Sequence, residues 1–184
     1  MKDALEGKRA SVLYKLLVLG FTFLVLSGCK SYYNTQNIYV EDGLIFKQGE
    51  SFPFTGRVLD TLKNKIVEYD VVGGFRNGEF CVSNLRGTFT IHGTIKNNKN
   101  IGTWYYFFEN GQLESKGNFN NDLPHGKWQW YYADGTLKSE GYYINGHQEG
   151  EWKSFSESGL LKSITLFAKG EVTNEVVVSK IYSL

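Results

Sequence analysis

An aromatic-rich run and a more polar run lie on either side of Asn110-Gly111 in the stretch WYYFFENGQLESKGNF, residues 104–119. Asn-Gly or Asp-Gly between two such runs is a strong signal for a β-hairpin, because a type I′ turn requires positive φ at both central residues. Asp134-Gly135 repeats this signal, and Ser158-Gly159 is a weaker version of it. The glycine density excludes long helices. The pattern therefore predicts a series of antiparallel hairpins.

The hairpin signals recur at one constant step of about 24 residues, a period typical of repeat proteins. Four columns keep this step: Gly-x-aromatic at Gly78, Gly102, Gly126 and Gly150; turn glycines at Gly111, Gly135 and Gly159; indoles at Trp104, Trp128 and Trp152; and a further glycine column at Gly93, Gly117 and Gly141. Equal spacing predicts one structural unit copied along the chain, in which each hairpin buries a surface of its neighbour.

The predicted turns also fix which residues face each other. Trp104 should face Gly117, Trp128 should face Gly141, and the last indole, Trp152, should face Thr165. A glycine opposite an indole leaves room for the ring to lie over the neighbouring backbone. We therefore expect the three indoles to form a buried row along one face of the sheet.

The opposite face combines aromatic rings with charge. The same register gives the pairs Tyr105–Lys116, Phe107–Glu114, Tyr131–Lys138 and Phe155–Lys162. Phe107, Tyr131 and Phe155 keep the step of the repeat, and two interpretations of this column stay open. It is either a cross-strand ladder that stiffens the sheet or an exposed stripe for a protein, peptide or glycan ligand. Together with Tyr105, these rings form the candidate binding face.

The stretch ADGTLKSEGYYINGHQEGEW contains a turn, Leu, Gly, an aromatic residue, Asn-Gly and Gly-x-Trp, and it resembles the bacterial variant of the MORN repeat. The resemblance extends from about Phe54 to Gly170 and is strongest between Gly102 and Phe167. It implies an all-β solenoid, an elongated, twisted antiparallel sheet of stacked hairpins. It also implies scaffolding, protein-interaction or membrane-proximal roles without shared catalytic residues. Some bacterial members carry the label of antitoxin.

Residues 1–28 have the features of a secretory signal peptide. A basic head precedes the apolar run Leu16–Leu26, which is too short to cross a hydrocarbon core of about 30 Å. The following sequence LSGC, Leu26–Cys29, resembles the lipobox of bacterial lipoproteins, which implies that Cys29 carries lipid. The alternative is a chance cysteine near an ordinary cleavage site.

The predicted domain organisation follows from these signals. Residues 1–28 are the signal peptide, 29–36 a tether, 37–53 a capping hairpin, 54–170 the repeats and 171–184 a capping strand. The location expected is outside the cytoplasm, with a lipid anchor on Cys29. By analogy with lipoproteins, Lys30 after the cysteine favours the outer membrane if the cell has one.

Charge and cysteine content narrow the function classes. The chain has a net charge of +1, and removal of residues 1–28, with four basic and two acidic residues, leaves −1. Without a basic block, nothing indicates a nucleic-acid partner. Cys81 has no cysteine partner if Cys29 is lipidated, so we expect a small buried side chain.

Motifs for catalysis are absent from the sequence. It has no Gly-x-Ser-x-Gly, no phosphate-binding loop and no His-Glu-x-x-His, so no enzyme activity and no cofactor are predicted. Two alternatives stay open: a metal site from loop residues Asp122, His125, His147 and Glu149, and paired carboxylates among Glu114, Glu140 and Glu157. Solvated loop residues and stacking are the preferred interpretations.

The predicted function is a non-catalytic binding or scaffolding module at the cell envelope, anchored to the membrane and bound to a protein partner. Two alternatives are an antitoxin-like neutraliser of a toxic partner protein and an enzyme that acts on envelope polymers.

Overall fold

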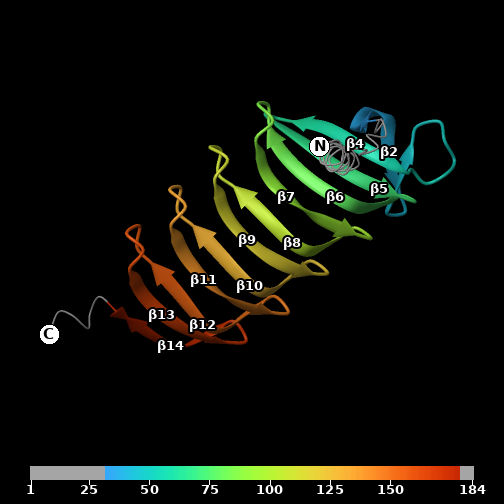
Figure 1. Cartoon of the computed structure of the whole chain (residues 1–184). Coiled ribbons are helices and arrows are strands. Elements are labelled where there is room, and N and C mark those ends of the chain that lie inside the picture. Colours follow the sequence, from blue (N-terminus) through green and yellow to red (C-terminus); the bar gives the residue numbers. More distant parts are fainter. Residues whose placement is uncertain (1–31, 179–184) are drawn as a thin grey trace, which may run out of the picture. The chain divides into compact units, whose positions relative to one another are not determined.

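The structure of this protein is a computed structural model that describes residues 32–178. The predictions for the signal peptide, for Cys29 and for residues 179–184 lie outside the described residues. Twelve strands form one sheet, in the order β1-β4-β5-β6-β7-β8-β9-β10-β11-β12-β13-β14, and β2 and β3 form a separate hairpin. From β4 to β14 every strand pairs with the next one in sequence (Figure 1). The predicted all-β sheet of successive antiparallel hairpins is confirmed.

The elements have the following bounds: β1 (Tyr32–Asn34), η1 (Thr35–Asn37), β2 (Ile38–Glu41), β3 (Leu44–Lys47), β4 (Gly56–Leu62), β5 (Lys65–Val72), β6 (Phe75–Asn84), β7 (Phe89–Lys96), β8 (Lys99–Phe107), β9 (Leu113–Asn120), β10 (Leu123–Tyr131), β11 (Leu137–Ile144), β12 (His147–Phe155), β13 (Leu161–Ala168) and β14 (Glu171–Val177). Across residues 32–178, no helix is long and apolar enough to cross a membrane.

The hairpin β2–β3 and the loop after it cover one end of the sheet. Ile45 and Phe54 pack with Val58 and Val71 in a small apolar core, in which Val58 is fully buried. The N–H of Ile45 donates to the carbonyl of Gly74 at 2.9 Å, and the N–H of Gly74 donates to the carbonyl of Phe54 at 2.8 Å. A hairpin thus lies within residues 37–53, and hydrogen bonds of its strand β3 and of the loop after it join it to the turn at Gly73-Gly74.

The predicted tether, residues 29–36, is too long. Tyr32–Asn34 form β1, which pairs in parallel with Arg57–Leu59 of β4, and a 3-10 turn follows at Thr35–Asn37. Backbone pairing at a sheet edge satisfies donors and acceptors that would otherwise face solvent. Only residues 30 and 31 lie between the predicted anchor cysteine, Cys29, and the first strand.

The turns form two rows, one along each long side of the sheet (Figure 1). On one side, here called the type I′ side, both central residues of each two-residue turn have positive φ. These turns are Gly73-Gly74, Asn97-Asn98, Asn121-Asp122, Asn145-Gly146 and Lys169-Gly170. On the other side, here called the glycine-loop side, the loops end in Gly87, Gly111, Gly135 and Gly159, each with positive φ.

The predicted type I′ turn at Asn110-Gly111 is wrong. The N–H of Gly111 donates to the carbonyl of Phe108, and the N–H of Phe108 donates to the carbonyl of Gln112, both at 2.8 Å. Of the two central residues only Gly111 has positive φ, 85°. These features describe a three-residue loop with a glycine bulge.

The longer loop displaces the first facing pair of each hairpin by one residue. The observed pairs are Phe107–Leu113, Tyr131–Leu137 and Phe155–Leu161, instead of the predicted partners Glu114, Lys138 and Lys162. A register shift directly after each pair restores the predicted alignment. Trp104–Gly117, Trp128–Gly141 and Trp152–Thr165 are therefore confirmed, as is Tyr105–Lys116.

The turns of the type I′ side bind the hairpin before them. The second turn residue donates its N–H to a carbonyl that lies just after the preceding turn of this side, in the pairs Asn98–Arg76, Asp122–Asn100, Gly146–Pro124 and Gly170–Gln148, at 2.9 to 3.0 Å. Donors and acceptors both advance by one repeat step from each pair to the next. Consecutive hairpins are thus joined in the same way along this side, as stacking predicts.

Candidate binding surface

The three indoles lie in a row on one face of the sheet, here called the indole face. Trp104 lies over Gly93, Trp128 over Gly117 and Trp152 over Gly141, and a Cβ on any of these glycines would overlap the ring. The glycine beneath each indole is therefore on the preceding strand and is not the glycine that pairs with it. This also explains why Trp152 keeps its place although it faces Thr165.

The glycines of Gly-x-Trp have another role. Gly102, Gly126 and Gly150 have φ of 64°, 72° and 69°, and they lie where the pairing with the preceding strand loses register. A β-bulge with positive φ redirects the strand and the side chains that follow it. The tryptophan two residues later is thereby turned over the preceding strand.

Rings from alternate strands fill the spaces between the indoles. The Phe119 ring lies edge-on to Trp104 at 5.8 Å and to Trp128 at 5.2 Å, and Tyr143 lies edge-on to Trp128 at 5.8 Å and to Trp152 at 5.1 Å. Edge-to-face contacts at these distances are favourable. Because Trp104 and Trp128 are only 5% and 7% exposed, this row is the core of the single sheet, as predicted.

The candidate binding residues lie on the opposite face, here called the mixed face. Tyr105 and Phe107 lie on β8 and stack on each other at 6.4 Å, Tyr131 ends β10, and Phe155 ends β12. All four side chains are half-buried. Since one strand separates each ring-bearing strand from the next, the column rings are about 10 Å apart. Among the described residues no ring contact joins Phe107, Tyr131 and Phe155, so they form a stripe and not a ladder.

Ion pairs lie beside this stripe. Lys127 Nζ lies 2.8 Å from Glu140 Oε2, and Gln129 donates to the same oxygen at 3.0 Å. The ion pair with Lys127 lowers the pKa of Glu140 despite its partial burial. Of the predicted carboxylates, Glu140 is therefore an ion-pair partner. A surface hollow of about 690 Å³ adjoins it and is lined in part by Lys127, Tyr142 and Lys153.

The loop acids considered as metal ligands bind the backbone instead. Asp122 Oδ1 accepts the N–H of Asn100 at 2.8 Å, and Glu149 Oε2 accepts the N–H of Lys169 at 2.8 Å. Within residues 32–178, no group of three or more His, Cys, Asp and Glu side chains is placed to hold a metal ion. These side chains fix turns on the type I′ side.

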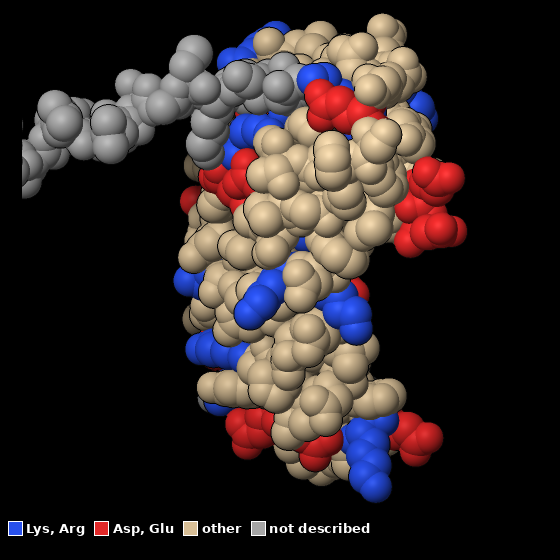
Figure 2. All heavy atoms as spheres, turned by 90° about the vertical axis from the view of Figure 1, so that its right-hand side faces the viewer, with Lys and Arg blue, Asp and Glu red and all other residues tan. Residues whose placement is uncertain are grey.

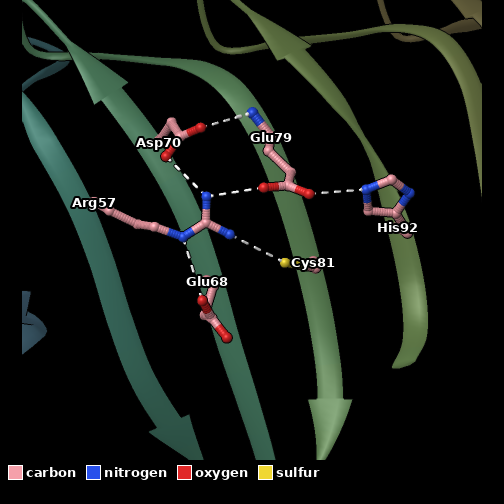
Figure 3. Close-up of polar contacts among 6 residues, drawn as sticks. All are labelled: Arg57, Glu68, Asp70, Glu79, Cys81 and His92. Carbon is pink, nitrogen blue, oxygen red and sulfur yellow. Dashed lines mark hydrogen bonds and ion pairs between the residues drawn. The ribbon is translucent and has the colours of Figure 1, made fainter. Parts of the chain in front are cut away.

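The structure contains a polar cluster around Arg57 that the sequence did not predict. Arg57 is 6% exposed, and its guanidinium contacts three carboxylates and a thiol (Figure 3). The contacts are Nε to Glu68 at 3.2 Å, Nη1 to Asp70 and to Glu79 at 3.0 Å each, and Nη2 to Cys81 Sγ at 3.4 Å. His92 Nε2 lies 3.1 Å from the other oxygen of Glu79. The acids surround a cation and do not form an open pair.

The electrostatics of this cluster hold it together. Burial alone would lower the pKa of Arg57, but hydrogen bonds with Glu79 and Glu68 and the charge of Asp70 raise it further above its usual range. Burial opposes ionisation of Glu79, but hydrogen bonds with His92 and Arg57 outweigh it and lower the pKa of this carboxyl. Burial raises the pKa of the Cys81 thiol, which is 4% exposed, as expected for a small core residue.

Only one feature of the sequence indicated the Arg57 cluster. Glu68 and Asp70 alternate along one strand, so both point to the same face. Arg57, which pairs with both acids, lies on β4, and Glu79 lies on β6. Both strands belong to the part of the chain where the repeat is degenerate. Without the periodic register, the sequence does not align these three strands.

The fold and the two faces define a protein of stacked β-hairpin repeats. Residues 101–121, 124–145 and 148–169 match the family described as MORN repeat variant. No curated protein is significantly similar to the chain. The three matches support a MORN-repeat protein, a class of binding or scaffolding modules. In the structure the same strand stacking continues to β5 and β6, before the first match.

Proposed function

We propose that this protein is an exported, lipid-anchored module that binds a protein partner on its mixed face. The observation that carries the proposal is the stripe of Phe107, Tyr131 and Phe155. These rings repeat at equal steps on a face of a single-layer sheet that no other described element covers. On the indole face the rings already pack against each other and against glycine, so this face is less suitable for binding a partner.

The composition of the mixed face suits a protein interface. Aromatic rings contribute large contact areas and are enriched among residues that dominate binding energy. Charged pairs at the border of such rings add specificity and steer association. Tyr131 and Phe155 lie on β10 and β12. The pair Lys127–Glu140 joins β10 to β11, and the 3.3 Å pair Lys153–Glu151 lies on β12.

The anchor part of the proposal is supported by the sequence. The apolar run Leu16–Leu26 and the lipobox-like Leu26–Cys29 occur at the spacing that lipoproteins have, and Lys30 favours the outer membrane in a cell with two membranes. One acyl chain binds membranes only marginally, whereas several hold a protein stably. A lipidated Cys29 would hold the module at the membrane, where envelope partners are concentrated.

The binding proposal is tested by capture from native membranes with the anchor intact. Tyr131→Ala combined with Phe155→Ala should leave thermal unfolding cooperative and lower the recovery of a specific partner band about tenfold or more. Leu85→Ala combined with Leu160→Ala is the matched control, because these side chains are 62% and 70% exposed and lie at the glycine loops. Equal recovery with both double variants would contradict binding at this face.

A further inference from the structure

Several exposed apolar side chains lie at the N-terminal end of the sheet. The N-terminal apolar patch consists of Tyr39, Val40, Phe52, Val72 and Phe75, which are 39%, 67%, 79%, 49% and 41% exposed. Phe52 is the most exposed large apolar side chain of the described residues. Side chains of this size gain free energy when they leave water, so such a group indicates a contact surface.

Backbone contacts bring these segments together. The loop from β3 to β4, residues 48–55, projects beyond the strand ends at this end of the sheet (Figure 1). Pro53, directly after Phe52, forms a bridge with Phe46, whose ring stacks on Tyr39 at 5.4 Å. Gly74, directly before Phe75, packs against Pro53 and binds Phe54 through its N–H. The exposed side chains are thus gathered around one fixed loop and one turn of the type I′ side. Because Val71 packs with Ile45 and Phe54, Val72 and its partner Phe75 point to the opposite face of the sheet, so the patch surrounds the end of the sheet and includes both faces.

The chain enters the sheet beside this patch. Cys29 precedes Tyr32 by three residues, and such a segment spans at most about 11 Å. Tyr32 pairs with Arg57 near the start of β4, five residues after Phe52. A lipid on Cys29 therefore holds this end of the sheet close to the bilayer, whereas the opposite end has no such constraint.

We propose that the N-terminal apolar patch lies on the lipid bilayer that carries the acyl chains of Cys29, and that Phe52 inserts into the interfacial region. This inference rests on the proposed lipid anchor and adds the orientation of the sheet. Apolar and aromatic side chains are stabilised at the boundary between headgroups and acyl chains. The mixed face near Tyr131 and Phe155, several strands away, is then left free for a partner.

The charge around the patch indicates an apolar contact and not an electrostatic one. Residues 38–53 contain Glu41, Asp42 and Glu50 but only Lys47 as a cation, and Lys47 is paired with Glu50 at 2.6 Å. Figure 2 looks onto the side of the sheet that faces right in Figure 1, and it shows mostly uncharged surface with acidic and basic groups scattered over it. Binding to anionic lipid would require a cluster of Lys and Arg.

The test uses the full-length lipidated protein in vesicles of phosphatidylcholine. A fluorophore is attached to Phe52→Cys and, in a second sample, to Leu160→Cys as the matched control, because Leu160 is 70% exposed on the last glycine loop. Cys81 is buried in both samples, which limits background labelling. On vesicles, iodide quenching at position 52 should fall at least about threefold and quenching at position 160 should stay unchanged. About 0.5 M NaCl should not reverse the protection.

Equal quenching at positions 52 and 160 on vesicles would overturn the orientation and leave the anchor proposal intact. Loss of protection in high salt would overturn the apolar contact. The anchor itself is scored separately, by lipid labelling and by flotation with vesicles. Cys29→Ser should abolish both. If the full-length protein takes up no lipid label, the anchor and the orientation fail together.

Discussion

Glycine is required at two columns of the repeat for different physical reasons. Gly117 has no room for a Cβ because the Trp128 indole lies on it, whereas Gly126 has a φ of 72° that residues with a Cβ adopt at a cost. The first column permits contact between strands, and the second directs the indole into that contact. One short motif, Gly-x-Trp, thus depends on a glycine in the preceding strand.

Replacement of Gly117 tests this contact at a single residue. Gly117→Ala should lower the free energy of unfolding by about 1–3 kcal/mol, because the new Cβ displaces the Trp128 ring. In a Trp128→Ala background, the same replacement should cost less than about 0.5 kcal/mol, because the ring is absent. Urea unfolding of the four proteins measures the coupling. Additive costs would show that the indole does not depend on the glycine.

The Arg57 cluster predicts acid sensitivity. Since the pKa of Glu79 is lower in the folded chain than its ordinary value of 4.5, protonation of this carboxyl favours the unfolded chain. Its contribution to stability is complete above pH 4.5 and is lost as pH falls through the lower folded value. Unfolding free energies measured between about pH 6 and pH 3 should fall less steeply for Glu79→Gln. Part of the pH dependence of the unfolding free energy should remain in Glu79→Gln, because Lys127 also lowers the pKa of Glu140. An unchanged slope in Glu79→Gln would contradict this role.

At the level of single residues, the sequence identified the periodic positions and missed the others. Trp104 and Gly117 could be aligned because their spacing repeats, and Tyr105 followed from the same register. Arg57 and Glu79 could not be aligned, because they lie on either side of a degenerate copy. The glycine beneath each indole was assigned to the wrong strand. The β-bulge at Gly-x-Trp turns the indole over the preceding strand, and the facing pairs derived from the turns do not reveal a bulge.

The strands and hairpins followed closely from the alternating runs, but the turn type at Asn110-Gly111 did not. Asn110-Gly111 matched the type I′ signal and forms a three-residue loop, whereas Asn121-Asp122 forms a type I′ turn without a glycine. Asn and Asp tolerate positive φ, and here Asp122 also gains a hydrogen bond to the preceding hairpin. The Asn-Gly signal alone therefore did not predict the turn type.

The turn at Asp122 offers a test of stacking between elements. Asp122→Asn keeps an acceptor and a residue that tolerates positive φ, so stability should change by less than about 0.5 kcal/mol. Asp122→Ala loses the bond to the Asn100 N–H and strains the turn, and should cost about 2–3 kcal/mol. Asp122→Gly relieves the strain but loses the bond and should lie between them. Thermal unfolding ranks the three variants, and equal stability of Asn and Ala would contradict the bond between hairpins.

For the whole molecule, the two faces of the sheet differ in composition. One face carries indoles packed on glycine and on neighbouring rings, and the other carries the aromatic stripe and ion pairs. A single-layer sheet of this kind gains its stability from each hairpin covering the next, and its length can change by whole units. The family resemblance and the period predicted this architecture. The parallel strand β1 has no counterpart in the repeat and was therefore assigned to a tether.

The central claim is that every hairpin stacks on its predecessor in the same relation, and deletion of one unit tests it most directly. Removal of residues 117–140, one full repeat step, joins Lys116 to Gly141 and replaces one covered glycine by the next. We predict a shorter sheet with cooperative thermal unfolding and a preserved near-ultraviolet circular dichroism signal from the indoles. Removal of 117–128, half a unit, should abolish both. A full-unit deletion that fails to fold, or a half-unit deletion that folds equally well, would contradict the account.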